Sequence, residues 1–170
     1  NKDGDALPVT AQFGWLGLYG TGNLAGSVDL QGRSNESGAV VTIISVGGHT
    51  AWTTTVVNGS WSFTGIPAVS YQVNIEQERY LDAQKGAAGS GVVVTAGGTT
   101  TLSQVKLLGG DANDDDVVDI SDGTIIGGKF GQTVDPATES ADINADGTVD
   151  IMDLVLFGGN YSKTSPVPWS

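Results

Sequence analysis

Two stretches in the last third of the chain share one pattern: DANDDDVVDISD at residues 111–122 and DINADGTVDIMD at residues 142–153. Each stretch begins with Asp, and the agreement continues beyond it, since Ile125, Ile126 and Phe130 correspond to Leu156, Phe157 and Tyr161. Two unrelated acidic stretches would not share this register. The segment is therefore an internal repeat, and each copy is expected to form one structural unit.

Acidic and amide side chains recur at positions 1, 3, 5, 9 and 12 of each stretch. In calcium-binding loops the oxygens at positions 1, 3 and 5 converge on one ion. Position 7 adds a backbone carbonyl, position 9 acts directly or through water, and position 12 closes the shell. The spacing predicts two calcium ions, one held by Asp111, Asn113, Asp115, the Val117 carbonyl, Asp119 and Asp122, the other by Asp142, Asn144, Asp146, the Thr148 carbonyl, Asp150 and Asp153.

Magnesium is the alternative ion, because Asp at position 12 reaches less far than Glu. Magnesium prefers octahedral geometry with several waters retained, whereas loops built from protein ligands favour calcium. Position 6 is Gly147 in the second loop but Asp116 in the first, and Asp adopts the sharp turn at a modest cost. We expect the first site to be weaker, and folding of the segment to depend on metal because the clustered carboxylates repel one another.

This repeat resembles a dockerin module, in which two loop–helix half-hands bind calcium. The resemblance covers residues 109 to about 163 and is carried by Gly110-Asp111-x-Asn113-x-Asp115 and Asp142-x-Asn144-x-Asp146-Gly147. It implies a cohesin-like protein partner, contacted through positions 10 and 11 of each loop, which here are Ile120, Ser121, Ile151 and Met152. The position-8 residues, Val118 and Val149, suit a short strand contact between the loops. The glycine pairs 127–128 and 158–159 could allow close backbone packing.

Residues 26–108 show the period of two that is typical of half-buried strands, as in Tyr71, Val73 and Ile75. Asn58-Gly59 is a strong hairpin signal, because both residues tolerate positive φ. These features predict an immunoglobulin-like or Greek-key β-sandwich. Seven strands are expected: Ser27–Leu30, Ala39–Val46, Thr50–Val57, Ser60–Phe63, Ser70–Glu76, Gly91–Ala96 and Thr99–Leu107. The sandwich is expected to stay folded when metal is removed, because its strands would form their own core.

The same segment resembles carboxypeptidase regulatory-like and Cna B-type modules. The resemblance is carried by Gly26-Ser27-Val28, Ser37-Gly38-Ala39-Val40-Val41, Asn58-Gly59-Ser60-Trp61-Ser62-Phe63 and Gly65-Ile66-Pro67. It implies a non-catalytic stalk or spacer in a surface protein. The chain as a whole is thus predicted to be mainly β, with a small α-helical module at residues 109–170.

Residues 1–25 form an N-terminal extension in which Val9, Ala11, Phe13 and Trp15 alternate with polar residues and glycine. This pattern predicts a strand with an apolar face that must be covered. The strand could pair with its own sandwich. Alternatively it could insert into a neighbouring copy by strand addition, with Val9, Phe13 and Trp15 as partner-binding residues.

The net charge of the chain is −12, and 12 of its 19 acidic residues lie between Asp111 and Asp153 with one base, Lys129. Such a field repels nucleic acid and attracts multivalent cations. No apolar run approaches the roughly 20 residues that span a bilayer. The first residue is Asn1 rather than Met, which suggests a removed leader. These observations favour a secreted protein, extracellular or at the cell surface.

Catalysis is not expected, because the carboxylates are committed to complete ligand sets and leave no open position for activating water. His49 lies in a Gly-rich turn. Three functions remain open. The chain could be a structural subunit that assembles into a filament through its strand and calcium module. It could be a dockerin-bearing fragment of a secreted polysaccharide-degrading enzyme or scaffold that docks onto a cohesin. It could be a carbohydrate-binding module that uses Trp52, Trp61 and Tyr71. The tail at 166–169 is expected to act as a clasp, with Trp169 near Gly109 and Gly110.

Overall fold

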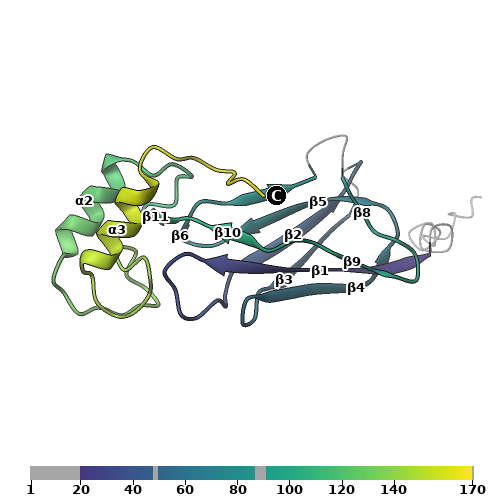
Figure 1. Ribbon diagram of the computed structural model, residues 1–170, viewed down its shortest axis with the longest axis horizontal. Coiled ribbons are helices and arrows are strands. Elements are labelled where there is room, and N and C mark those ends of the chain that lie inside the picture. Colours follow the sequence, from purple (N-terminus) through teal and green to yellow (C-terminus); the bar gives the residue numbers. More distant parts are fainter. Residues whose placement is uncertain (1–19, 48–49, 87–90, 170) are drawn as a thin grey trace, which may run out of the picture.

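The computed structural model describes residues 20–47, 50–86 and 91–169, which form an elongated molecule with strands along most of its length and two helices at one end (Figure 1). The predicted strand with Val9, Phe13 and Trp15 lies outside the described residues, as does His49. Pairing of that strand, in its own sandwich or in a neighbouring copy, therefore stays a prediction.

The strands form two main sheets. In the first, β1 (Thr21–Leu30) pairs antiparallel with β4 (Ser60–Pro67) and parallel with β9 (Thr99–Thr101) and β10 (Val105–Leu107). In the second, the order is β3 (Ala51–Thr55), β2 (Val40–Ser45), β5 (Ser70–Glu76) and β7 (Ala83–Lys85), and β8 (Val92–Val93) also pairs with β5.

The core between these sheets comes from the predicted alternation of side chains. Tyr71, Val73 and Ile75 of β5 are each 0% exposed, and Trp61 and Phe63 of β4 are also buried. Their neighbours along each strand face solvent or the rim, as expected for side chains that point alternately to the two faces of a sheet. The prediction of a β-sandwich is confirmed.

The strands depart from the prediction in several places: β6 (Arg79–Tyr80) and β7 were not expected, and β8 covers only Val92–Val93 of the expected Gly91–Ala96. β1 begins at Thr21 rather than Ser27, and residues 99–107 form two strands instead of one. Ala25 pairs with Thr101, whereas Val28 pairs with Val105. The segment that joins β9 to β10 therefore has one more residue than β1 has between the same two pairings. An extra residue of this kind interrupts the ladder as a bulge does.

The Asn58-Gly59 turn forms as predicted. The two residues have φ of 48° and 72°, and Val57 and Ser60 exchange backbone hydrogen bonds across them. The strands that the turn joins then diverge, because β3 belongs to one sheet and β4 to the other. The turn therefore connects the two sheets of the sandwich.

The C-terminal module joins the sandwich through β11 (Gly109–Asp111), which pairs antiparallel with β6 (Arg79–Tyr80). Its helices are α2 (Ile120–Lys129) and α3 (Ile151–Asn160), one after each predicted loop. Buried residues of both parts belong to one continuous hydrophobic core. None of the described helices is long and apolar enough to cross a membrane.

Packing between the helices depends on a glycine that the sequence did not single out. A Cβ atom at Gly123 of α2 would lie 2.8 Å from the Phe157 ring of α3. The glycine pairs 127–128 and 158–159 have no atom within 4 Å of the corresponding position. The expectation that these pairs allow close backbone packing is therefore wrong, because they face open space near the helix ends.

The C-terminal tail crosses back to the sandwich, as Figure 1 shows. The Val167 N–H donates to the Asp82 carbonyl at 2.8 Å, and Trp169 Nε1 donates to the Ser103 carbonyl at 3.0 Å. Lys85 Nζ lies 5.6 Å from the centre of the Trp169 ring. The tail is thus a clasp, but its tryptophan covers the sandwich rather than Gly109 and Gly110.

Candidate functional site: two acidic loops

Position 12 closes each acidic loop by bonding to the backbone. In the first loop Asp122 Oδ1 accepts from the Asn113 N–H at 3.1 Å, and its Oδ2 accepts from the Asp119 N–H at 2.8 Å. In the second loop Asp153 Oδ1 accepts from the Ile143 N–H, and its Oδ2 accepts from the Asp150 N–H, both at 2.8 Å. Both carboxylates are 0% exposed.

Position 9 begins each helix. The Oδ1 atoms of Asp119 and Asp150 accept from the N–H groups of Ser121 and Met152, both at 2.7 Å. Together with position 12, each forms a capping box, which satisfies free backbone donors in the first turn. One carboxylate pair thus closes the loop and starts the helix.

Position 1 organises the turn itself. Asp111 Oδ1 and Oδ2 accept from the N–H groups of Asp115 and Asp116, and Asp142 accepts from Asp146 and Gly147 in the same way. The amide oxygen at position 3 also accepts from the N–H at position 5 in both loops. Positions 1, 3 and 5 are therefore linked by the same set of hydrogen bonds in both copies.

The sharp turn requires left-handed backbone at positions 4 and 6. Asp114 and Asp116 have φ of 59° and 68°, and Ala145 and Gly147 have φ of 55° and 90°. Non-glycine residues rarely adopt such angles, although Asp tolerates them better than most. The first loop therefore uses two acidic residues where the second uses Ala and Gly.

Four loop carboxylates, those of Asp111, Asp122, Asp142 and Asp153, are at most 1% exposed. The two side-chain ion pairs among the described residues join Lys106 to Asp29 and Lys129 to Glu139, so neither neutralises these four groups. Burial raises the pKa of Asp111 to about 6, although backbone hydrogen bonds from Asp115 and Asp116 oppose the rise. Burial also raises the pKa of Asp153. Among the described residues, these four loop carboxylates are thus buried without a side-chain ion pair.

This donor set fits a hard cation. Carboxylate and amide oxygens with a backbone carbonyl are ligands that calcium and magnesium accept. In both loops the carboxylates accept hydrogen bonds from loop N–H groups. Among the described residues, no three acidic side chains form a cluster that could hold a metal ion. Asn113 Nδ2 donates to Asp115 Oδ2 at 2.8 Å, and Asn144 Nδ2 donates to Asp146 Oδ2 at 2.9 Å. The residues that would hold a cation thus lie in contact with one another in both loops.

Each loop is supported by the segment that follows the helix of the other copy. The Val118 N–H donates to the Lys163 carbonyl at 3.0 Å, and the Ser162 N–H donates back to the Val118 carbonyl at 2.8 Å. Val149 makes the same exchange with Gln132 and Gly131, at 3.0 and 2.8 Å. The expected strand contact between Val118 and Val149 is wrong, because these cross-copy segments take up their backbone groups.

The residues at positions 10 and 11 all lie on the surface. Ile120 is 68% exposed, Ile151 59% and Met152 52%, and Ser121 is also exposed. Val155, one turn after Ile151, is exposed by 57% and was missed from the sequence, although its spacing of four residues along the helix signals it. The start of α3 therefore presents a larger apolar surface than the start of α2, where Thr124 occupies the equivalent position.

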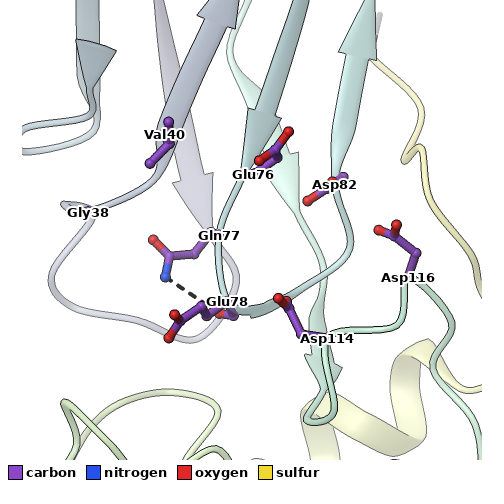
Figure 2. A pocket seen from close by; sticks show the side chains of 8 residues that line it. All are labelled: Gly38, Val40, Glu76, Gln77, Glu78, Asp82, Asp114 and Asp116. Carbon is purple, nitrogen blue, oxygen red and sulfur yellow. Dashed lines mark hydrogen bonds between the residues drawn. The ribbon is translucent and has the colours of Figure 1, made fainter. Parts of the chain in front are cut away.

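An acidic cleft of about 450 Å³ separates the first loop from the end of the sandwich. Figure 2 shows Glu76, Glu78 and Asp82 on the sandwich side, facing Asp114 and Asp116 of the loop. Burial and these neighbouring carboxylates raise the pKa of Asp82 to about 7. Sequence reasoning missed this cleft, because it joins residues that are far apart in the chain.

The aromatic residues considered for carbohydrate stacking belong to the core. Trp61 is 4% exposed and Tyr71 0%, and Trp52 packs edge-on against Tyr71 with 5.7 Å between ring centres. Stacking on a sugar requires an exposed ring face. Trp61 and Tyr71 therefore offer no such platform, whereas Trp52 is only partly buried.

No protein-family model matches the chain, and no curated protein is similar to it in sequence. Solved structures show the fold. One chain of a mutant type II Cohesin-X-Dockerin complex from Acetivibrio cellulolyticus, altered at its N-terminal interface, superposes with a TM-score of 0.67 at 21% identity, covering 85% of this chain and 97% of that chain. The corresponding C-terminal interface mutant gives the same TM-score and coverage at 20% identity.

Proposed function

We propose that this chain is a non-catalytic, calcium-dependent protein-docking module, in which two calcium ions hold the helices and the exposed helix starts bind a protein partner. The observation that carries the proposal is the pair of matching loops, each with two almost fully buried carboxylates that belong to no side-chain ion pair among the described residues. Burial of unpaired charge is costly, and pairing with a cation removes that cost.

The proposed ligands are the residues predicted from the spacing. Asp111, Asn113 and Asp115 would hold the first ion, and Asp142, Asn144 and Asp146 the second. The buried position-12 residues, Asp122 and Asp153, would complete each set with the carbonyls of Val117 and Thr148. Asp119 and Asp150 cap the helices and are placed to act through water. A bound cation would supply charge balance and rigidity in this site.

The docking role is supported by the exposed residues Ile120, Ile151, Met152 and Val155 at the starts of the two helices. The similarity to a chain of the Cohesin-X-Dockerin complexes adds support, because 85% of this 170-residue chain is more than the 108 residues that precede the module. The matched region is therefore too long to lie within residues 1–108 alone. We propose a cohesin-like β domain as the partner and an extracellular or cell-surface location.

Calorimetric titration of chelator-stripped protein with calcium tests the metal sites. We expect two calcium ions per chain, and weaker binding in a parallel titration with magnesium, because these loops are built from protein ligands rather than retained water. Failure to bind either cation would overturn the proposal. Tighter binding of magnesium would retain the sites but change the ion.

Binding to a purified type II cohesin tests the docking role. Val155→Asp should weaken binding at least tenfold, because it places a charge in the apolar surface of α3. Val57→Asp is a matched control, since Val57 is 62% exposed on a sandwich turn and Val155 is 57% exposed. Equal affinities of the two variants, or no calcium-dependent binding by the unaltered protein, would exclude a cohesin contact at this surface.

A further inference from the structure

Arg79 and Tyr80 of β6 lie where the sandwich meets both acidic loops. They are polar residues with 4% and 1% exposure. Arg79 has φ of 72°, a left-handed conformation that a residue of this size rarely adopts. Buried polar groups and unfavourable backbone angles persist where surrounding contacts compensate for them. For Arg79, those contacts are with the residues at position 1 of each loop, Asp111 and Asp142.

The backbone of this pair holds the first loop. Arg79 is opposite Asp111, and Tyr80 is opposite Gly109, in the antiparallel pairing of β6 with β11. Position 1 of the first loop is thus paired with one residue of the sandwich.

The side chains of the same pair hold the second loop. Arg79 Nη1 donates to the Asp142 carbonyl at 2.8 Å and to the Pro136 carbonyl at 3.0 Å. The Tyr80 hydroxyl lies 3.1 Å from the Ile143 carbonyl oxygen and 3.0 Å from that of Gln31, as a donor to both. These bonds fix the backbone at positions 1 and 2 of the second loop.

The ring of Tyr80 is itself closely packed. The Arg33 guanidinium lies 5.5 Å from its ring centre. A Cβ atom at Gly109 would lie 3.2 Å from its ring and 2.8 Å from the Ile143 side chain, so only glycine leaves room for this approach. The hydroxyl therefore has little freedom to follow a displaced loop.

We infer that Arg79 and Tyr80 are positioning residues that couple both cation loops to the sandwich. This inference rests on the proposed calcium binding. A loop whose first ligand is held in place loses less conformational entropy when the ion binds, so its affinity is higher. Coupling is reciprocal, so calcium in the loops stabilises the sandwich by the same factor. The sandwich therefore does not respond to metal as an independent domain, contrary to the expectation from the strand pattern.

Hydrogen exchange of the unaltered protein gives the first test. Amides of β2 and β5, the central strands of the second sheet, should exchange more slowly with calcium than with chelator. Protection that changes only within residues 109–165 would overturn the coupling while leaving calcium binding intact. Failure to bind calcium in the titration described above would instead overturn the proposed function.

Paired Tyr→Phe substitutions give the second test. Tyr80→Phe should weaken calcium binding at the second loop about fivefold to tenfold, the range expected for one lost hydrogen bond. Asp115→Ala in the background disables the first loop, so the second is measured alone. Tyr71→Phe is the control, because Tyr71 is equally buried and donates to the Pro67 carbonyl at 2.9 Å within the sandwich.

We expect Tyr71→Phe to lower the stability of the fold without changing calcium affinity. Equal calcium affinities in the two variants would show that Tyr80 contributes only to stability, and would overturn its positioning role. Arg79→Lys keeps the charge but loses the planar group that reaches two carbonyls, so it should weaken the second site as well. It decides the question if Tyr80→Phe does not fold.

Discussion

The two acidic loops share most of their internal hydrogen bonds but have different surroundings. The second loop lies against the sandwich, where Ile143 is 0% exposed and Asn144 9%. In the first loop the equivalent Asn113 is exposed, and the loop borders the acidic cleft. The repeat has therefore duplicated the proposed ligands and the helix caps, whereas the contacts that hold each copy come from elsewhere in the chain.

This difference predicts how each copy responds to damage. Asp153 and Asp122 are equivalent by the repeat, but Asp153 Oδ1 accepts from two N–H groups, those of Ile143 and Asn144. Its Oδ2 accepts from the Asp150 N–H. The second copy thus has the more extensively bonded closure, next to the contacts from Arg79 and Tyr80.

The largest expected effect is loss of this closure. Asp153→Ala should lower the free energy of unfolding in calcium by about 3 kcal/mol, because it removes several charge-assisted hydrogen bonds. Calcium stoichiometry should fall from two ions to one. Asp122→Ala should remove one ion with a smaller loss of stability. Chemical denaturation and calorimetry measure both quantities, and a larger loss in Asp122→Ala would reverse the proposed difference between the loops.

Exchanging the residues at position 6 isolates the backbone part of the comparison. Asp116 has φ of 68° and Gly147 has φ of 90°. Asp116→Gly should stabilise the metal-free protein by about 1 kcal/mol, and Gly147→Asp should destabilise it by a similar amount. A Cβ atom at Gly147 would lie 3.7 Å from the Val134 carbonyl oxygen, so no clash contributes. Thermal unfolding in chelator measures both changes in stability. If both substitutions changed the stability in the same direction, the backbone at position 6 would not explain the difference between the loops.

Sequence periodicity predicted the parts of this molecule that depend on local contacts. The hydrogen bonds within each acidic loop, the two helices, the Asn58-Gly59 turn and the buried side of β5 follow from residues close together in the chain. The cleft and the roles of Arg79 and Tyr80 depend on the approach of distant segments. β6 has two residues and β7 three, which is too short to show a period of two.

The acidic cleft beside the first loop predicts that the stability of the protein depends on pH through Asp82. The folded pKa of Asp82 is about 7, above its ordinary value near 4. Its contribution to stability is therefore fully present below pH 4 and is lost as the pH rises through 7. Asp82→Asn should stabilise the metal-free protein at pH 8 and flatten the decline between pH 4 and pH 7. The measurement is the unfolding midpoint of both proteins in chelator between pH 4 and pH 8. If the midpoint of the variant fell with pH in parallel with that of the unaltered protein, Asp82 would not be the group responsible.

The smallest effect concerns positions where the two copies should behave alike. Gly128 and Gly159 are equivalent by the repeat, lie next to the last residues of α2 and α3, and face open space. Replacing either by Ala should raise the free energy of unfolding by about 0.5–1 kcal/mol, because Ala restricts the unfolded chain and favours the helix. Gly123→Ala is the control of opposite sign, since its Cβ would collide with the Phe157 ring at 2.8 Å. Denaturant unfolding of the three variants in calcium measures these differences. Unequal gains at positions 128 and 159 would show that the asymmetry between the loops extends to the ends of their helices, because a terminal turn contributes to stability only if it is folded.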